Sequence, residues 1–215
     1  MTSIAVIDYG SSNLRSVAKA VEHVAAPGTA VKVAADAATI LAADRVVFPG
    51  QGAIGDCMRR LAQTALTDAL RRAMADKPFL GICLGLQSLM THSDEDGGTD
   101  CLAVVPGTVR RFPAGVIDPE TGIRFKIPHM GWNEVHWQKA HPLTDGIASG
   151  SRFYFVHSYH VVPDDEDTVA ARTGYIETFV SALARDNLFA TQFHPEKSQK
   201  AGLKLLENFC RWDCG

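Results

Sequence analysis

Short apolar runs alternate with segments of helical periodicity in the first half of this chain, and this alternation constrains its fold more than any other feature. The apolar runs occupy residues 4–8, 30–34, 45–48 and 78–82. Between them apolar residues recur at helical spacing, most clearly over residues 58–75, where we expect one long helix. Strands that alternate with helices predict βαβ units, and therefore a parallel sheet that helices cover on both faces.

The second half of the chain is richer in strands than in helices. We expect a closing helix over residues 199–212 and strands at residues 104–112, 132–137, 152–157, 168–172, 179–184 and 188–193. We find no internal repeat, linker or low-complexity segment. The sequence therefore predicts a single α/β domain, residues 1–215, with three layers, a mostly parallel central sheet and an antiparallel extension.

The composition argues against several classes of partner and compartment. A formal net charge of −3 gives no electrostatic reason to expect a nucleic acid or an anionic membrane surface as a partner. No apolar run approaches the length of about 18 residues that a membrane span needs, and the N-terminus is typical of a strand rather than a signal peptide. Five scattered cysteines without a CxxC pair argue against a disulfide framework or a zinc site, and favour a reducing cytoplasm.

Cys83 lies in the segment FLGICLGLQ, at the end of an expected strand and before a helix expected over residues 84–91. A free cysteine is usually a small buried apolar residue, and this is one interpretation of Cys83. The other is a nucleophile on a sharp turn beyond the carboxyl end of a parallel strand, where ligand sites of open sheets lie. Such a turn needs small residues two positions before and after the nucleophile, and Gly81 and Gly85 meet that need.

A cysteine nucleophile needs a base, and the base needs a group that orients it. His194 and Glu196, in the segment QFHPEKS, are two residues apart, so their side chains project to the same side of an extended chain. A carboxylate beside an imidazole fixes its tautomer and stabilises its charged form. Alone, this segment is more typical of a surface turn, but together with the cysteine motif it favours a catalytic base.

A third segment, PGQG at residues 49–52, also follows an expected strand. Its simplest interpretation is a glycine-rich turn between a strand and a helix. The alternative is that backbone N–H groups of Gly50, Gln51 and Gly52 stabilise an oxyanion. The spacing is not that of a P-loop, so we do not expect a phosphate site here.

These three segments together resemble the class I, triad-type glutamine amidotransferases, over essentially the whole chain. The resemblance rests on PGQG at residues 49–52, GICLGLQ at residues 81–87 and HPE at residues 194–196. It implies a flavodoxin-like core, a triad of Cys83, His194 and Glu196 that hydrolyses glutamine, and oxyanion donors from Leu84 and residues 50–52. It implies no metal and no organic cofactor.

Other segments bear on which amidotransferase this is. DYGSSNL at residues 8–14, KIPHMGWN at residues 126–133 and FVHSY at residues 155–159 are similar to the glutaminase subunit of imidazole glycerol phosphate synthase. This resemblance implies a heterodimer with a separate (β/α)8-barrel synthase subunit in histidine biosynthesis. It places on the docking face Asn13, Pro128, Met130, Trp132, Asn133, Tyr154 and Lys197. It places around bound glutamine Gly52, Gln87, Glu95, Ser158 and Tyr159.

The chain departs from that family at two positions, and other functions compete with this one. Ser12 stands where glycine is usual, and Gln51 where valine is common. One rival is a glutaminase that serves another synthase, of the anthranilate or guanylate (GMP) type. Others are a cysteine hydrolase of similar fold, which would leave the glutamine and docking motifs unexplained, and a catalytically silent subunit, which would not need the intact triad.

Overall fold

The structure, a computed structural model, describes residues 2–10 and 14–214. Its helices are α1 (Leu14–Val24), α2 (Ala37–Ala42), α3 (Ile54–Gln63), α4 (Leu66–Asp76), α5 (Leu84–Gln87) and α6 (Gln199–Arg211). Its longer strands are β1 (Ser3–Ile7), β2 (Ala30–Ala34), β3 (Arg45–Gly50), β4 (Phe79–Cys83), β7 (Gly107–Arg111), β8 (His129–Trp137), β9 (Ser151–His157), β10 (Tyr159–Pro163), β11 (Val169–Gly174), β12 (Thr178–Arg185) and β13 (Leu188–Thr191). Two short strands, β5 (His92–Ser93) and β6 (Thr99–Asp100), flank a 3₁₀ turn.

The parallel part of the sheet has the strand order β2-β1-β3-β4-β13. This is the flavodoxin-like order, in which the chain reverses direction across the sheet beside β1. Every residue of β3 and β4 is buried, because helices cover the sheet on both faces. The prediction of a parallel α/β sheet from the alternating apolar runs is confirmed.

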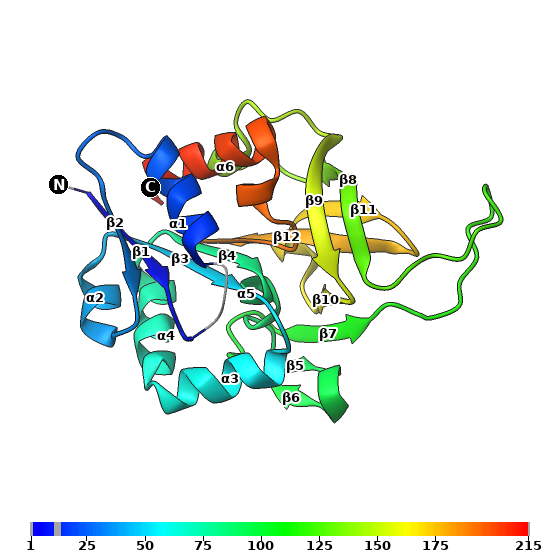
Figure 1. The fold of residues 1–215 in the computed structure, drawn as a ribbon, viewed down its shortest axis with the longest axis horizontal. Coiled ribbons are helices and arrows are strands. Elements are labelled where there is room, and N and C mark those ends of the chain that lie inside the picture. The colour runs from blue at the N-terminus through cyan, green and yellow to red at the C-terminus, as the bar shows by residue number, and fades with distance from the viewer. Residues whose placement is uncertain (1, 11–13, 215) are drawn as a thin grey trace.

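Helices form a layer on each side of this sheet (Figure 1). On one side α1 and α6 pack together and bury Val21 and Phe209 against the sheet. On the other side α2, α3 and α4 bury Ile40, Leu61 and Leu70. The three layers predicted from the sequence are therefore present.

The sheet continues as an antiparallel extension beyond β13. Strands β12, β10 and β7 follow in antiparallel pairing, and β11 branches from β12 to join β8 and β9. The extension was predicted, although β10 was not among the expected strands. Together these strands place the carboxyl end of β9 beside the carboxyl ends of β3, β4 and β13, where the cleft described below opens.

Two expected helices differ from the observed ones. The single helix expected over residues 58–75 is wrong, because Ala65 takes a left-handed conformation with φ +55° and separates α3 from α4. The helix expected over residues 84–91 is also too long. It ends at Gln87, and the backbone carbonyls of Ser88 and Met90 instead accept hydrogen bonds from Leu102 and Ala103.

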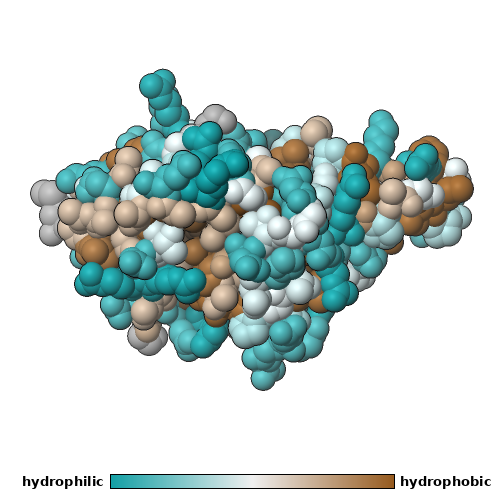
Figure 2. Space-filling view, turned by 90° about the horizontal axis from the view of Figure 1, so that it is seen from below, coloured by the Kyte–Doolittle hydropathy of each residue, from teal (hydrophilic) through white to brown (hydrophobic). Residues whose placement is uncertain are grey.

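A protruding arm, residues 113–128, connects β7 to β8 (Figure 1). It is closed by a backbone hydrogen bond from Asp118 to Ile123, and it carries the exposed apolar side chains Ile117 and Ile123. In the view of Figure 2 the arm projects from the body as a knob with brown, apolar atoms. The arm leads directly into β8, the strand of the expected docking residues.

In the part of the chain that the structure describes, no helix combines the length and the apolar character needed to cross a bilayer.

Candidate active site

Cys83 is the last residue of β4 and lies on a strand-to-helix turn, with φ 56° and ψ −106°. The turn brings backbones close together. A Cβ atom on Gly85 would lie 2.0 Å from the Phe48 carbonyl oxygen, and one on Gly81 would lie 3.1 Å from the Gly85 carbonyl oxygen. Both flanking glycines are therefore required by close contact, as the sequence predicted. Cys83 is 7% exposed and belongs to the buried apolar cluster, but it also lines an open cleft, where a ligand can reach it.

His194 lies just beyond the end of β13, the strand that pairs in parallel with β4. Its Nδ1 atom is 2.8 Å from the Glu196 Oε1 atom, and the two side chains are 5% and 1% exposed. Because the carboxylate can only accept, Nδ1 carries the proton. Nε2 is buried and makes no other hydrogen bond to a described residue, so it is the ring atom left to interact with Cys83, which also shifts the pKa of His194. The structure brings together the three residues that the sequence singled out from segments far apart.

The charge of His194 is set by its neighbours. Burial alone would lower the pKa of His194, but the Cys83 thiolate and the Glu196 carboxylate outweigh it and raise this pKa to about 10. The imidazole is therefore protonated at neutral pH. A charged imidazole beside a cysteine favours the nucleophilic form of sulfur, and it is also an acid ready to protonate a leaving group.

A cleft of about 630 Å³ opens above Cys83 and His194. Such a volume suits a small polar molecule and lies in the usual range of ligand pockets. All five residues expected around glutamine line it, namely Gly52, Gln87, Glu95, Ser158 and Tyr159. Of the expected oxyanion residues, Gln51 and Leu84 also line it, and of the expected docking residues, Pro128 and Lys197 do.

Glu95 stands on the cleft wall although its neighbours are solvated. Asp94 and Asp96, in the acidic stretch 93–100, are exposed. Glu95 is half-buried instead, and its Oε2 atom accepts a hydrogen bond of 2.8 Å from the Ile54 N–H group. Burial raises the pKa of the Glu95 carboxyl, although that hydrogen bond opposes the shift. This carboxylate can pair with a cation such as an amino group.

The expected oxyanion segment runs alongside the nucleophile. Gly50 pairs with Cys83 in the ladder of β3 and β4. A Cβ atom on Gly50 would lie 2.8 Å from the Leu84 Cβ atom, so a close approach of the two backbones requires glycine there. Gly52 has φ +93°, a conformation that favours glycine, and faces open space. Backbone N–H groups of this segment and of Leu84 thus lie beside the nucleophile.

Gln192 is a site residue that the sequence reasoning missed. It is fully buried, and its Nε2 atom donates to the Cys83 sulfur at 3.6 Å. Gln87 donates through Nε2 to the Gln192 Oε1 atom at 3.1 Å and to the Tyr159 carbonyl oxygen at 3.0 Å. The position of Gln192, two residues before the expected base His194, is the sequence signal that could have identified it.

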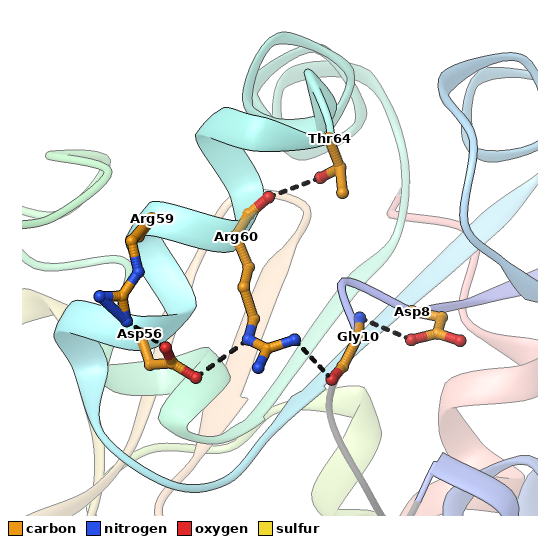
Figure 3. Close-up of polar contacts among 6 residues, drawn as sticks. All are labelled: Asp8, Gly10, Asp56, Arg59, Arg60 and Thr64. Atoms are coloured by element: carbon orange, nitrogen blue, oxygen red, sulfur yellow. Dashed lines mark hydrogen bonds and ion pairs between the residues drawn. The ribbon is translucent and has the colours of Figure 1, made fainter.

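A polar cluster joins the loop after β1 to helix α3 (Figure 3), and its residues Gly10, Asp56 and Arg60 line the cleft. Arg60 donates to the Gly10 carbonyl oxygen at 3.1 Å and to the Asp56 carboxylate at 2.9 Å, while the Gly10 N–H group donates to Asp8 at 2.8 Å. These contacts tie the turn at Gly10 to the first turn of α3, which follows the oxyanion segment. Arg59 also pairs with Asp56.

The expected docking residues lie beside this cleft. Met130 and Trp132 project from the same face of β8 and are 62% and 38% exposed. Trp132 contacts the Tyr154 ring edge-on at a centroid distance of 6.2 Å, and the Lys197 Nζ atom lies 5.8 Å from the Tyr154 ring centroid. Asn133 is half-buried and points inward, and Asn13 lies outside the described residues. The exposed group adjoins the triad, since Lys197 follows Glu196.

A family model described as "Glutamine amidotransferase class-I" matches residues 5–212. This chain belongs to that family. Among curated relatives, it is 56% identical to the imidazole glycerol phosphate synthase subunit HisH of Aromatoleum aromaticum over 99% of both chains. It is also 56% identical to the HisH subunit of Methylococcus capsulatus, over 99% of this chain and 98% of that one. The chain is therefore a class I glutamine amidotransferase of the HisH type.

Solved structures support the fold at low sequence identity. The crystal structure of a putative GMP synthase component from Thermoplasma acidophilum has a TM-score of 0.71 at 19% identity, with 98% of this chain and 93% of that chain covered. A crystal structure titled as a glutamine amidotransferase has a TM-score of 0.67 at 16% identity, with 95% and 98% covered.

Proposed function

We propose that this chain is the glutaminase subunit of imidazole glycerol phosphate synthase, and that Cys83, His194 and Glu196 are its catalytic triad. The HisH-type relatives, at 50–58% identity, support the choice of this synthase over one of the anthranilate or GMP type. The observation that carries the catalytic proposal is the Cys83 nucleophile paired with a buried, carboxylate-bound imidazole in one cleft.

The reaction begins with attack of the Cys83 thiolate on the side-chain amide carbon of glutamine. N–H groups of Leu84 and of residues 50–52 stabilise the oxyanion, a type of contact worth about 10²–10³ in turnover. The tetrahedral intermediate collapses to a thioester as protonated His194 gives its proton to the departing amine, releasing ammonia. Neutral His194 then takes a proton from water, which attacks the thioester and releases glutamate.

The rest of the cleft holds the glutamine backbone groups. Glu95 is the partner of the substrate amino group, because its half-buried carboxylate faces the cleft. Gln87, Ser158 and Tyr159 also line the cleft and are available to the other polar groups of the substrate. No metal or organic cofactor takes part in these steps, since the triad and backbone amides supply all the acid, base and nucleophile that amide hydrolysis requires.

The ammonia then passes to a (β/α)8-barrel synthase subunit bound as a heterodimer. Free ammonia in water would be protonated and diluted, so direct transfer preserves its reactivity. In the barrel it would form imidazole glycerol phosphate and aminoimidazole-carboxamide ribonucleotide, in histidine biosynthesis in the cytoplasm. Exposed Met130 and Trp132, with Tyr154 and Lys197, support docking at the mouth of the cleft.

The test compares Cys83→Ala with the matched variant Cys210→Ala, whose thiol lies on α6 away from the cleft. Each is mixed with an imidazole glycerol phosphate synthase barrel subunit. Cys83→Ala should bind the barrel and support synthesis from ammonium salts, but not from glutamine. Cys210→Ala should retain both activities. Glutamine-dependent turnover by Cys83→Ala near the wild-type rate would exclude the proposed nucleophile.

A further inference from the structure

Two buried histidines take no part in the proposed chemistry, yet they join the docking strand to the cleft, because His129 begins β8 and His157 lines the cleft. They are 4% and 6% exposed and face each other in the ladder of β8 and β9. The His129 Nδ1 atom lies 3.0 Å from the His157 Nε2 atom. A direct hydrogen bond between two imidazoles requires that one ring donates and the other accepts.

At its inner end this pair reaches the nucleophile through amide groups. The His157 Nδ1 atom lies 2.7 Å from the Tyr159 carbonyl oxygen, which also accepts from Gln87 Nε2 at 3.0 Å. The same Gln87 nitrogen donates to Gln192, and Gln192 donates to the Cys83 sulfur. An unbroken series of hydrogen bonds therefore runs from His157 to the sulfur.

At its outer end the pair reaches the docking strand. The Asn133 Nδ2 atom lies 3.3 Å from the His129 Nε2 atom and donates to the Gly174 carbonyl oxygen at 2.8 Å, while its Oδ1 atom accepts from the Glu134 N–H group. These contacts fix the orientation of the Asn133 amide. Asn133 follows Trp132, whose side chain projects from the docking face. A shift of β8 on docking would thus reach His129 directly.

The Tyr159 carbonyl sets the direction of every bond in the series. A carbonyl only accepts, so His157 carries its proton on Nδ1 and accepts through Nε2. His129 must then also carry its proton on Nδ1 and accept from Asn133 through Nε2. Both rings are neutral in this arrangement. Burial among aromatic rings lowers the pKa of His129 to about 4 and that of His157 to about 3, in agreement with neutral rings.

We propose that His129 and His157 are positioning residues that couple the docking face at Asn133 to the Tyr159 carbonyl and, through Gln87 and Gln192, to the Cys83 sulfur. This inference rests on the proposed function. Each neutral ring has one donor and one acceptor, so a broken link leaves a buried polar atom without a partner. Movement at one end therefore favours a matching rearrangement at the other, which is the physical requirement for coupling between two sites.

A double-mutant cycle tests this coupling. His157→Asn keeps a donor for the Tyr159 carbonyl but loses the acceptor for His129, and Asn133→Ala removes the outer donor. In the presence of saturating barrel subunit, each change should lower kcat for glutamine hydrolysis roughly tenfold. The double variant should also lose only about tenfold, because both changes break one series of bonds. His23→Asn, at the exposed C-terminal end of α1, is the control and should leave kcat unchanged.

The free chain gives a measurement that needs no partner. ¹⁵N NMR of the imidazoles should show both His129 and His157 with the proton on Nδ1. The same double-mutant cycle, measured on glutamine hydrolysis by the free chain, should again be non-additive. A barrel subunit that does not bind the wild type would contradict the proposed function, while these two results would still support the series. Multiplicative losses of about a hundredfold, or an Nε2–H tautomer on either ring, would overturn the inference.

Discussion

Replacing Gly85 by alanine tests how closely the nucleophile and the oxyanion segment must approach. The added Cβ atom would lie 2.0 Å from the Phe48 carbonyl oxygen, whereas an ordinary contact begins near 3.4 Å. The neighbour is backbone, so β3 and α5 must separate by about 1 Å or more to relieve the clash. Phe48 is two residues before Gly50, and Gly85 two residues after Cys83, so the separation widens the gap between nucleophile and oxyanion donors.

The expected size of the effect follows from that displacement. A misplacement of about 1 Å in a catalytic site costs about 10²-fold in turnover, and the overpacking itself costs about 1–3 kcal/mol in the free energy of unfolding. The assay is kcat for glutamine hydrolysis in the saturated complex, with stability measured by urea unfolding. Gly174→Ala is the matched control, because its Cβ atom meets nothing within 4 Å. It should be neutral or stabilising by up to about 1 kcal/mol. Wild-type turnover by folded Gly85→Ala would refute the reasoning.

Three further outcomes are expected. Glu196→Gln should lower the pKa of His194, which burial depresses but Cys83 and Glu196 raise to about 10. Because the folded-state pKa exceeds the unfolded one, the stability difference between wild type and Glu196→Gln should be largest below pH 6.5 and shrink as pH approaches 10, as urea unfolding would measure. A constant difference would contradict this. Iodoacetamide at neutral pH should label Cys83 first, because burial raises the pKa of the other four thiols, those of Cys57, Cys101, Cys210 and Cys214. Peptide mapping would detect any other order. Phe209→Ala should lower the free energy of unfolding by about 3–5 kcal/mol, and exposed Val33→Ala should lower it by less than about 0.5 kcal/mol. Equal losses would contradict the placement of Phe209 in the core.

Local patterns were sufficient to predict the parts of the fold that local contacts determine. The apolar runs at β3 and β4 indicated strands buried on both faces, and the glycines around Cys83 indicated a close turn. The break at Ala65 was not predictable, because alanine is a strong helix former and only the packing of α3 against α4 accounts for its left-handed conformation.

The site was predictable where motifs carry its chemistry, and not where tertiary contacts do. The triad follows from short segments with recognisable spacing. Gln192 forms hydrogen bonds with Cys83, 109 residues away in the sequence, and with Gln87, 105 residues away. No sequence periodicity relates positions so far apart. The pairing of His129 with His157 depends on the register of β8 and β9, which the sequence does not reveal without the intervening turn.

The position of β13 in the sheet has a consequence for synthesis of the protein. This strand leaves the ribosome after all the other strands of the described sheet, yet it inserts between β4 and β12 near the middle of that sheet. Until it arrives, a nascent chain exposes the long apolar edge of β4 and keeps the nucleophile more than a hundred residues from its base. The unfinished chain is therefore both inactive and prone to aggregate, and a late, long-range pairing step completes the fold and the triad together.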